Sequence, residues 1–244
     1  MFSLPVARFR VLSAMLLTFT LCAPVFAMAQ DSLEDPWSPV NKRIFTFNQH
    51  FDDWFMRPLA KGYAAVVPPP AQKGVRNFLS NLDDVTVMVN SALQGKAADA
   101  ASDGGRVLLN TTFGVVGLWD VARHVGLEKN SEDFGQTLGV WGVGPGPYVI
   151  IPFLGPSTFR DTFGLGIDVT SSPISLAEKP ATRNMLHAMD ILDTRVQALQ
   201  LDDLMYGDRY IFMREAYLQQ RQYEVTDGEM PSARDDSDPW SDWD

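Results

Sequence analysis

The chain has 244 residues, with 20 Lys and Arg, 30 Asp and Glu and one Cys, so its formal net charge at pH 7 is −10. This acidity excludes general electrostatic binding to nucleic acid, which needs Lys and Arg against phosphate. The single Cys excludes an internal disulfide and any Cys-rich zinc or iron–sulfur centre. Aromatic residues make up 11% of the chain, a high share for so acidic a protein.

Residues 1–29 have the three regions of a secretory signal peptide. Arg8 and Arg10 precede an apolar run over residues 11–26, which ends in Ala27-Met28-Ala29. The order predicts export and cleavage after Ala29. Cys22 is a doubtful lipidation site, because Leu21 stands where a lipoprotein signal has a small residue. A membrane anchor is the alternative, for which the run is short.

An aromatic helix is predicted over residues 41–56, capped by Asn41 and ended by Arg57-Pro58. Apolar residues recur there at three- and four-residue steps, as on one face of a helix. They are Ile44, Phe47, Phe51, Trp54 and Phe55. Such a face is either core or a surface embedded in the membrane interface.

Helical periodicity continues along the chain. It predicts helices over residues 72–93, 97–109, 185–199 and 206–223, the second weakened by Gly104-Gly105. Residues 134–155 are rich in Gly and Pro, which predicts turns and short extended pieces. Residues 224–244 carry eight acids and one Arg and are predicted to be a disordered acidic tail. The predicted domain therefore covers residues 30–223.

The sequence has no recognisable catalytic motif. No Ser has the G-x-S-x-G frame of a hydrolase. The glycines at 142, 144 and 146 lack the Lys-Ser/Thr of a phosphate loop. Adjacent Asp pairs, such as Asp52-Asp53, diverge on a helix. We expect no enzyme, no cofactor and no metal.

Several blocks of the sequence are similar to those of a known family. The longest is FGQTLGVWGVGPGPYVIIPFLGPSTFRD at residues 134–161. Others are DPWSPVNKRIFTFN at 35–48, VVPPPAQKGVRNFLSNL at 66–82 and LLNTTFGVVGLWDVA at 108–122. In these blocks and their order, the sequence resembles the MlaA (VacJ) family of outer-membrane phospholipid-transport proteins. The resemblance covers almost all of the chain after the signal peptide.

The resemblance implies an all-α ring of amphipathic helices in the periplasmic leaflet of a Gram-negative outer membrane, with a central channel. It implies retrograde transport of phospholipids misplaced in the outer leaflet. The implied partners are a trimeric porin and a soluble periplasmic carrier of the MlaC type. The alternative is a periplasmic lipid-binding or scaffold protein that contacts the membrane only through partners.

Site residues follow as hypotheses. A Gly-rich loop is predicted to gate the channel, because closely spaced Gly and Pro allow close approach and hinge motion. Its residues are Gly135, Gly139, Gly142, Gly144, Pro145 and Gly146. A tight structural turn that packs helix on helix is the alternative. The aromatic face of residues 41–56 is predicted to embed in the membrane. Asn110 and Thr111, polar within an apolar segment, are candidates for the channel lining.

Overall fold

The computed structural model describes residues 35–200, 202 and 207–229. The predicted signal peptide with Cys22, and residues 230–244 of the predicted tail, lie outside these ranges. The described part is mostly helical, which confirms the predicted fold class. A two-stranded antiparallel hairpin is the exception, with Tyr148 opposite Thr158.

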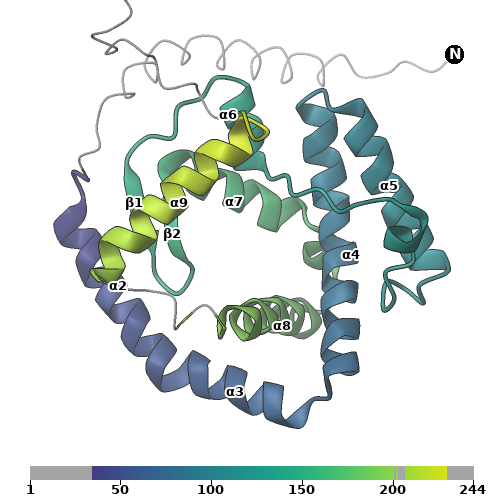
Figure 1. Cartoon of the computed structure of the whole chain (residues 1–244), viewed down its shortest axis with the longest axis horizontal. Coiled ribbons are helices and arrows are strands. Elements are labelled where there is room, and N and C mark those ends of the chain that lie inside the picture. The colour runs from purple at the N-terminus through teal and green to yellow at the C-terminus, as the bar shows by residue number, and fades with distance from the viewer. Residues whose placement is uncertain (1–34, 201, 203–206, 230–244) are drawn as a thin grey trace, which may run out of the picture.

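The helices are arranged in a ring (Figure 1). One edge consists of α2 (Ser38–Phe51), the π-helical turn η1 (Asp52–Met56) and α3 (Arg57–Val66), and α4 (Pro69–Leu93) forms the next. The opposite edge holds α6 (Phe134–Val140) and α7 (Phe159–Ser171), and α9 (Arg209–Val225) closes the ring beside the hairpin of β1 (Tyr148–Ile151) and β2 (Gly155–Thr158). Inside the ring, α8 (Pro180–Ala198) is seen end-on.

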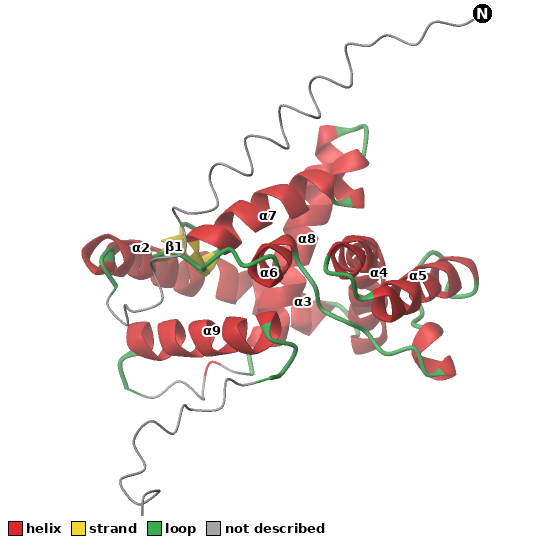
Figure 2. Cartoon of the chain, turned by 90° about the horizontal axis from the view of Figure 1, so that it is seen from above, coloured by secondary structure: helices red, strands yellow, loops and turns green. Residues whose placement is uncertain are grey.

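Three further elements complete the order. Helix α5 (Ala97–Thr112) packs outside α4, and the short helices η2 (Ala122–Val125) and η3 (Pro173–Leu176) follow α5 and α7. Figure 2 shows α7 on one side of the layer that holds α2, α4 and α5, and α9 on the other. The ring is therefore built from helices at three levels.

The predicted cap at Asn41 is wrong, because α2 already begins at Ser38. The Asp35 carboxylate accepts a hydrogen bond from the Trp37 amide and so supports the chain before the helix. Asn41 is buried in the first turns, where its side chain donates to Tyr148 O and accepts from Ile150 N, both at 3.0 Å. It attaches α2 to β1.

Asn48 repeats this attachment two turns later. Its side chain donates to Ile151 O at 3.0 Å and accepts from Phe153 N at 2.8 Å. Seven helical residues rise about 10 Å, and three strand residues span about 10 Å. The two Asn side chains therefore reach β1 in register.

The predicted end of this helix at Arg57-Pro58 is also wrong, because the chain stays helical through α3. The Arg57 amide bonds to Asp52 O, five residues back, which makes the turn before Pro58 a π-helix. A proline in a helix removes one hydrogen bond and crowds the preceding turn. We attribute its tolerance here to the wider turn, which places Pro58 in the first turn of α3.

The prediction of turns and extended pieces over residues 134–155 holds only in part. Residues 134–140 form α6, whose N-terminus is capped by the Asp133 carboxylate accepting from Gln136 N at 2.8 Å. The strand β1 confirms an extended piece. Gly135 and Gly139 lie in this helix despite their low helix propensity, because neighbouring segments approach α6 too closely there for any larger residue.

The remaining predicted helices are confirmed with small shifts. The helix predicted over 72–93 begins earlier as α4, and α5 passes through Gly104-Gly105, where an added Cβ on Gly104 would come within 3.2 Å of the Met88 sulfur. The last two predictions correspond to α8 and α9. Because α9 ends at Val225, the first two residues of the predicted tail are helical.

Candidate functional site

The protein buries polar groups and exposes apolar ones. Among the described residues, 15 polar or charged side chains are buried but only 10 hydrophobic ones, while 31 large hydrophobic side chains are exposed. Charged residues are almost never fully buried unless they are paired, and the buried charges here are paired or hydrogen-bonded, as Arg106 is with Asp84. Extensive exposed apolar surface marks interaction with another protein or with a membrane. Much of the surface of the described residues therefore suits apolar surroundings.

Most of the predicted embedding residues form one aromatic face. Trp54 is 86% exposed, Phe55 56% and Phe47 48%. Phe51 contacts Phe55 and Phe153, with ring centroids 5.3 and 4.9 Å apart. Phe153, on the turn between β1 and β2, also meets Phe47 at 5.1 Å and was missed by the sequence prediction.

Ile44 lies apart from this aromatic face. It packs against the small core cluster of Phe45, Tyr148, Ile150 and Tyr210. The helix α2 therefore has two apolar sides, one toward the core and one toward the outside.

The predicted gate residues divide between a helix and a loop. Gly135 and Gly139 lie in α6, whereas Gly142, Gly144, Pro145 and Gly146 lie in the loop between α6 and β1. An added Cβ on Gly135 would stand 2.7 Å from an Asp161 oxygen and 2.9 Å from Arg221 Nη2. Gly135 thus permits close packing of α6.

The loop glycines have a different role. Gly142 and Gly146 have φ values of +88° and +68°, a region that L side chains rarely adopt. Nothing lies within 4 Å of the Cβ position of Gly142, so this turn is open. The turn is closed by backbone hydrogen bonds, from Gly142 N to Gly139 O and from Val143 N to Leu138 O, both at 2.9 Å.

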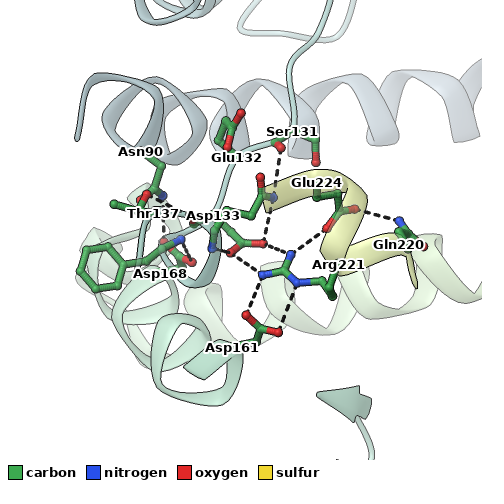
Figure 3. Close-up of polar contacts among 12 residues, drawn as sticks. Asn90, Ser131, Glu132, Asp133, Thr137, Asp161, Asp168, Gln220, Arg221 and Glu224 are labelled. Atoms are coloured by element: carbon green, nitrogen blue, oxygen red, sulfur yellow. Dashed lines mark hydrogen bonds and ion pairs between the residues drawn. The ribbon is translucent and has the colours of Figure 1, made fainter. Parts of the chain in front are cut away.

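An ion-pair network ties α9 to α6 and α7. Figure 3 shows Arg221 between Asp133 and Asp161, and its two terminal nitrogens donate to these carboxylates at 2.6 and 2.9 Å. Burial alone would raise the pKa of Asp161, but the Arg221 guanidinium lowers it to about 2. The pKa of Asp133 is lowered by the same partner, also against burial. Three elements that meet at the Gly-rich segment are therefore held by one cation.

A second polar network lies beside it. Thr137 in α6 donates to Asn90 at 2.9 Å, and Asn90 donates to Asp168 at 3.1 Å (Figure 3). Asp168 also accepts from the Phe134 amide at 2.9 Å. These bonds join α4, α6 and α7 through the buried Asn90 and Thr137 and the half-buried Asp168.

Two cavities lie on either side of α8. The α4–α8 cavity has a volume of about 510 Å³ and is lined by α4, α7, η3, α8 and Lys129. The α2–α9 cavity has a volume of about 590 Å³ and is lined by α2, η1, the hairpin, α8 and α9. Volumes of this size are typical of ligand sites.

The α2–α9 cavity is amphipathic. Its apolar wall includes Phe45, Ile150, Phe153, Leu154, Phe212 and Met213. Its charged end holds Arg195, which pairs with Asp52 and with Asp202 at 2.9 Å, and Arg57, which pairs with Asp53 at 3.0 Å. Such a cavity can hold a molecule with a charged end and an apolar end.

Asn110 and Thr111 line neither cavity. Asn110 is buried, donating to Asp120 at 3.1 Å and accepting from Ala122 N at 2.9 Å. Thr111 accepts from Asn81 at 3.0 Å. Both hold α5 to neighbouring segments, and their part in a channel stays a prediction.

The described residues contain neither a metal-ligating cluster nor a membrane-spanning helix. No group of three or more His, Cys, Asp or Glu side chains there is placed to hold a metal ion. No described helix has both the length and the hydropathy needed to cross a membrane.

Comparison with known proteins agrees with these features. Intermembrane phospholipid transport system lipoproteins MlaA from Shigella flexneri and Escherichia coli K12 are each 35% identical over 207 residues, covering 82% of both chains. The Haemophilus influenzae protein of that name is 29% identical over 84% of this chain and 83% of its own.

A solved structure gives the same result. It comes from work on the structural basis for maintenance of bacterial outer membrane lipid asymmetry, and it matches with a TM-score of 0.71 and 35% identity. The match covers 79% of this chain and 99% of the other. The family model described as MlaA lipoprotein matches residues 33–224. The chain therefore belongs to the MlaA lipoprotein family.

Proposed function

We propose that this protein removes phospholipids misplaced in the outer leaflet of a Gram-negative outer membrane and passes them inward. The observation that carries the proposal is the burial pattern of the described residues, in which 31 large hydrophobic side chains are exposed while polar side chains outnumber hydrophobic ones among those that are buried. Exposed apolar side chains can contact lipid tails, and the charged end of the α2–α9 cavity can hold a headgroup. Relatives at 35% identity are named for phospholipid transport. Movement of a lipid needs no covalent step, so we propose no enzymatic activity.

We propose that the ring lies in the periplasmic leaflet through its aromatic face. Burying one large apolar side chain contributes about 1.5–3 kcal/mol, so several can hold the protein without a spanning helix. The partners that we propose are a porin trimer beside the ring and a soluble carrier of the MlaC type. A scaffold that reaches the membrane only through partners is the competing function.

Membrane extraction separates these two functions. The double variant Phe47→Asp and Phe51→Asp places two charges on the aromatic face, four residues apart. Thr46→Asp with His50→Asp is the matched control, because both positions are exposed on the same helix with the same spacing. We expect the first pair to be released from outer membranes by carbonate and the second pair to stay. Equal retention of both pairs would contradict the embedded position.

We propose that the loop after α6 gates lipid passage. The support is the open turn at Gly142, where a side chain meets strain but no neighbour. In the native host, deletion of the gene is expected to raise phospholipid at the cell surface, and the Gly142→Leu protein is expected to restore asymmetry poorly. Gly126→Leu is the control, since Gly126 has the same φ of +88° and open space elsewhere. Normal surface phospholipid with Gly142→Leu would refute the gate.

The same gene deletion also tests whether the protein transports phospholipid at all. If cells that lack this protein keep normal surface phospholipid, the proposed function is wrong. Rescue by Cys22→Ala would show that lipidation at Cys22 is not required.

A further inference from the structure

The loop that follows α5 carries an exposed apolar surface of its own. We define the α5 loop as residues 113–119, and no charged residue lies between Arg106 and Asp120. Every exposed side chain of the loop is apolar, with exposed fractions from 41% to 72%: Phe113, Val115, Val116, Leu118 and Trp119. Helix α5 lies beyond α4, at the end of the layer opposite to α2 (Figures 1 and 2). This surface is therefore separate from the aromatic face.

Two adjacent residues of the α5 loop have a strained backbone. The φ angles of Val115 and Val116 are +52° and +58°, in the left-handed region. A β-branched residue is an outlier there, and Gly or Asn is the usual occupant. Both side chains are exposed, so packing within the described part of the chain does not account for the strain. Strain that persists at an exposed apolar position indicates that the side chain is used outside the chain.

Most amides of the α5 loop are already bonded within the chain. Hydrogen bonds of 2.8–3.3 Å join the amides of residues 113, 114 and 116–119 to carbonyl groups of residues 109–115. Gly114 and Gly117 are buried, and an added Cβ on them would stand 2.1 Å from Trp119 O and 2.7 Å from Asn81 Cβ. The loop is therefore compact, and its backbone offers few donors to a partner.

These properties favour lipid over protein as the partner of the α5 loop. A protein interface needs about one hydrogen bond per 100–200 Å² and a polar rim. Hydrocarbon requires instead that backbone polar groups are bonded within the chain. Trp119, the last residue of the loop, precedes Asp120, and Trp is typical of the boundary between acyl chains and headgroups. The loop therefore suits acyl chains, with Trp119 at their polar boundary.

We propose that the α5 loop inserts into the acyl region of the leaflet as a second membrane contact, separate from the aromatic face. This inference rests on the proposed position of the ring in a leaflet and adds the site that holds its opposite end. Phe153 of the aromatic face is likewise exposed and has a φ of +67°. Both contacts thus present apolar side chains from turns that would suit Gly. Two contacts at opposite ends of one layer hold that layer parallel to the membrane.

Labels that report contact with lipid test this placement. The only Cys is Cys22, so the full chain with Cys22→Ala can carry one new Cys bearing a fluorophore. Val116→Cys labels the α5 loop, and Ala98→Cys is the matched control, exposed at the other end of α5. In porin-free vesicles of phosphatidylethanolamine and phosphatidylglycerol, we expect spin-labelled lipid to quench the Val116 label about threefold more than the Ala98 label. Aqueous iodide should show the opposite order.

A label at Trp54→Cys, on the aromatic face, separates this inference from the proposed function. Lipid quenching at Trp54 but not at Val116 would overturn the insertion of the α5 loop and leave the proposed function standing. Protection of the Val116 label from both quenchers would also overturn the insertion, because another copy of the protein would then cover the loop. If lipid quenches neither label, the proposed embedding of the ring fails, and this inference fails with it.

The strained backbone supplies a second test. Val115→Asn with Val116→Asn removes the apolar side chains but keeps the left-handed turns, which Asn tolerates. We expect an unchanged or higher melting temperature in detergent, but about ten- to hundredfold weaker binding to the same vesicles, since two Val side chains no longer contact acyl chains. Ala97→Asn with Ala98→Asn is the control, adding two exposed amides at the other end of α5, and should bind as the wild type does. A lower melting temperature or unchanged vesicle binding of the first pair would refute the insertion.

Discussion

The contact between α6 and α7 is closed by two facing glycines, and Gly164→Ala tests how much it contributes. An added Cβ on Gly164 would stand 2.4 Å from the Gly135 nitrogen and 2.7 Å from its Cα. Both neighbours are backbone atoms, so no side-chain rotation relieves the contact. Helix α6 must move away from α7, which pulls the Asp133 cap away from Arg221.

The magnitude follows from these contacts. Overpacking of this kind costs about 1–3 kcal/mol, and weakening a charge-assisted hydrogen bond adds about 1.5–3 kcal/mol. The helix gains only about 0.5–1 kcal/mol when Gly is replaced by Ala. We therefore expect a net loss of about 2–4 kcal/mol, or roughly 5–15 °C in melting temperature.

Thermal unfolding in detergent, followed by circular dichroism, measures this loss. Gly166→Ala is the control in the same helix, because nothing lies within 4 Å of its Cβ position. That variant should gain about 0.5–1 kcal/mol from helix propensity alone. If Gly164→Ala and Gly166→Ala melt at the same temperature, the close packing of α6 on α7 contributes no stability and the reasoning fails.

Further predictions concern buried polar contacts. Arg221→Met should lower the free energy of unfolding by about 1.5–3 kcal/mol in urea titrations, because it removes the cation that Asp133 and Asp161 share. In the wild type, the lowered pKa of Asp161, about 2, means that its contribution is nearly complete above pH 4 and falls by about 2 kcal/mol as the pH drops toward 2. Arg221→Met should reduce this acid-dependent loss, because Arg160 and Thr158 remain as partners of Asp161. An unchanged acid transition would contradict the pairing with Arg221. Asn41→Leu should cost about 1–3 kcal/mol and raise hydrogen exchange at the Ile150 amide, whereas unchanged exchange would exclude the attachment of α2 to β1.

The helices could be predicted where their apolar period is local. The confirmed predictions over 72–93 and 185–199 needed no knowledge of partners. The errors arose where a distant segment decides the conformation. Gly135 is stable in a helix because Gly164, far along the chain, leaves it room, and Asn41 binds a strand instead of capping a helix.

The site could be predicted less fully than the fold. Phe47, Trp54 and Phe55 are exposed, because three- and four-residue steps keep side chains on one side of a helix. Their embedding in a membrane stays a prediction. The charges of the two cavities come from helices that meet only in the folded ring. A polar residue such as Asn110 gives the same sequence signal whether it lines a lumen or closes a buried network.

The two Asn side chains of α2 have a consequence for assembly. One side of β1 pairs with β2, and Asn41 and Asn48 bond backbone groups on the residues from Tyr148 to Phe153. A bare strand edge recruits strands from other copies, and this tendency grows where apolar side chains surround it. Helix α2, through Asn41 and Asn48, already makes hydrogen bonds with those backbone groups, so they are not open to a strand from another copy. A protein with so much apolar surface thereby lacks one common starting point for aggregation while it is delivered to its membrane.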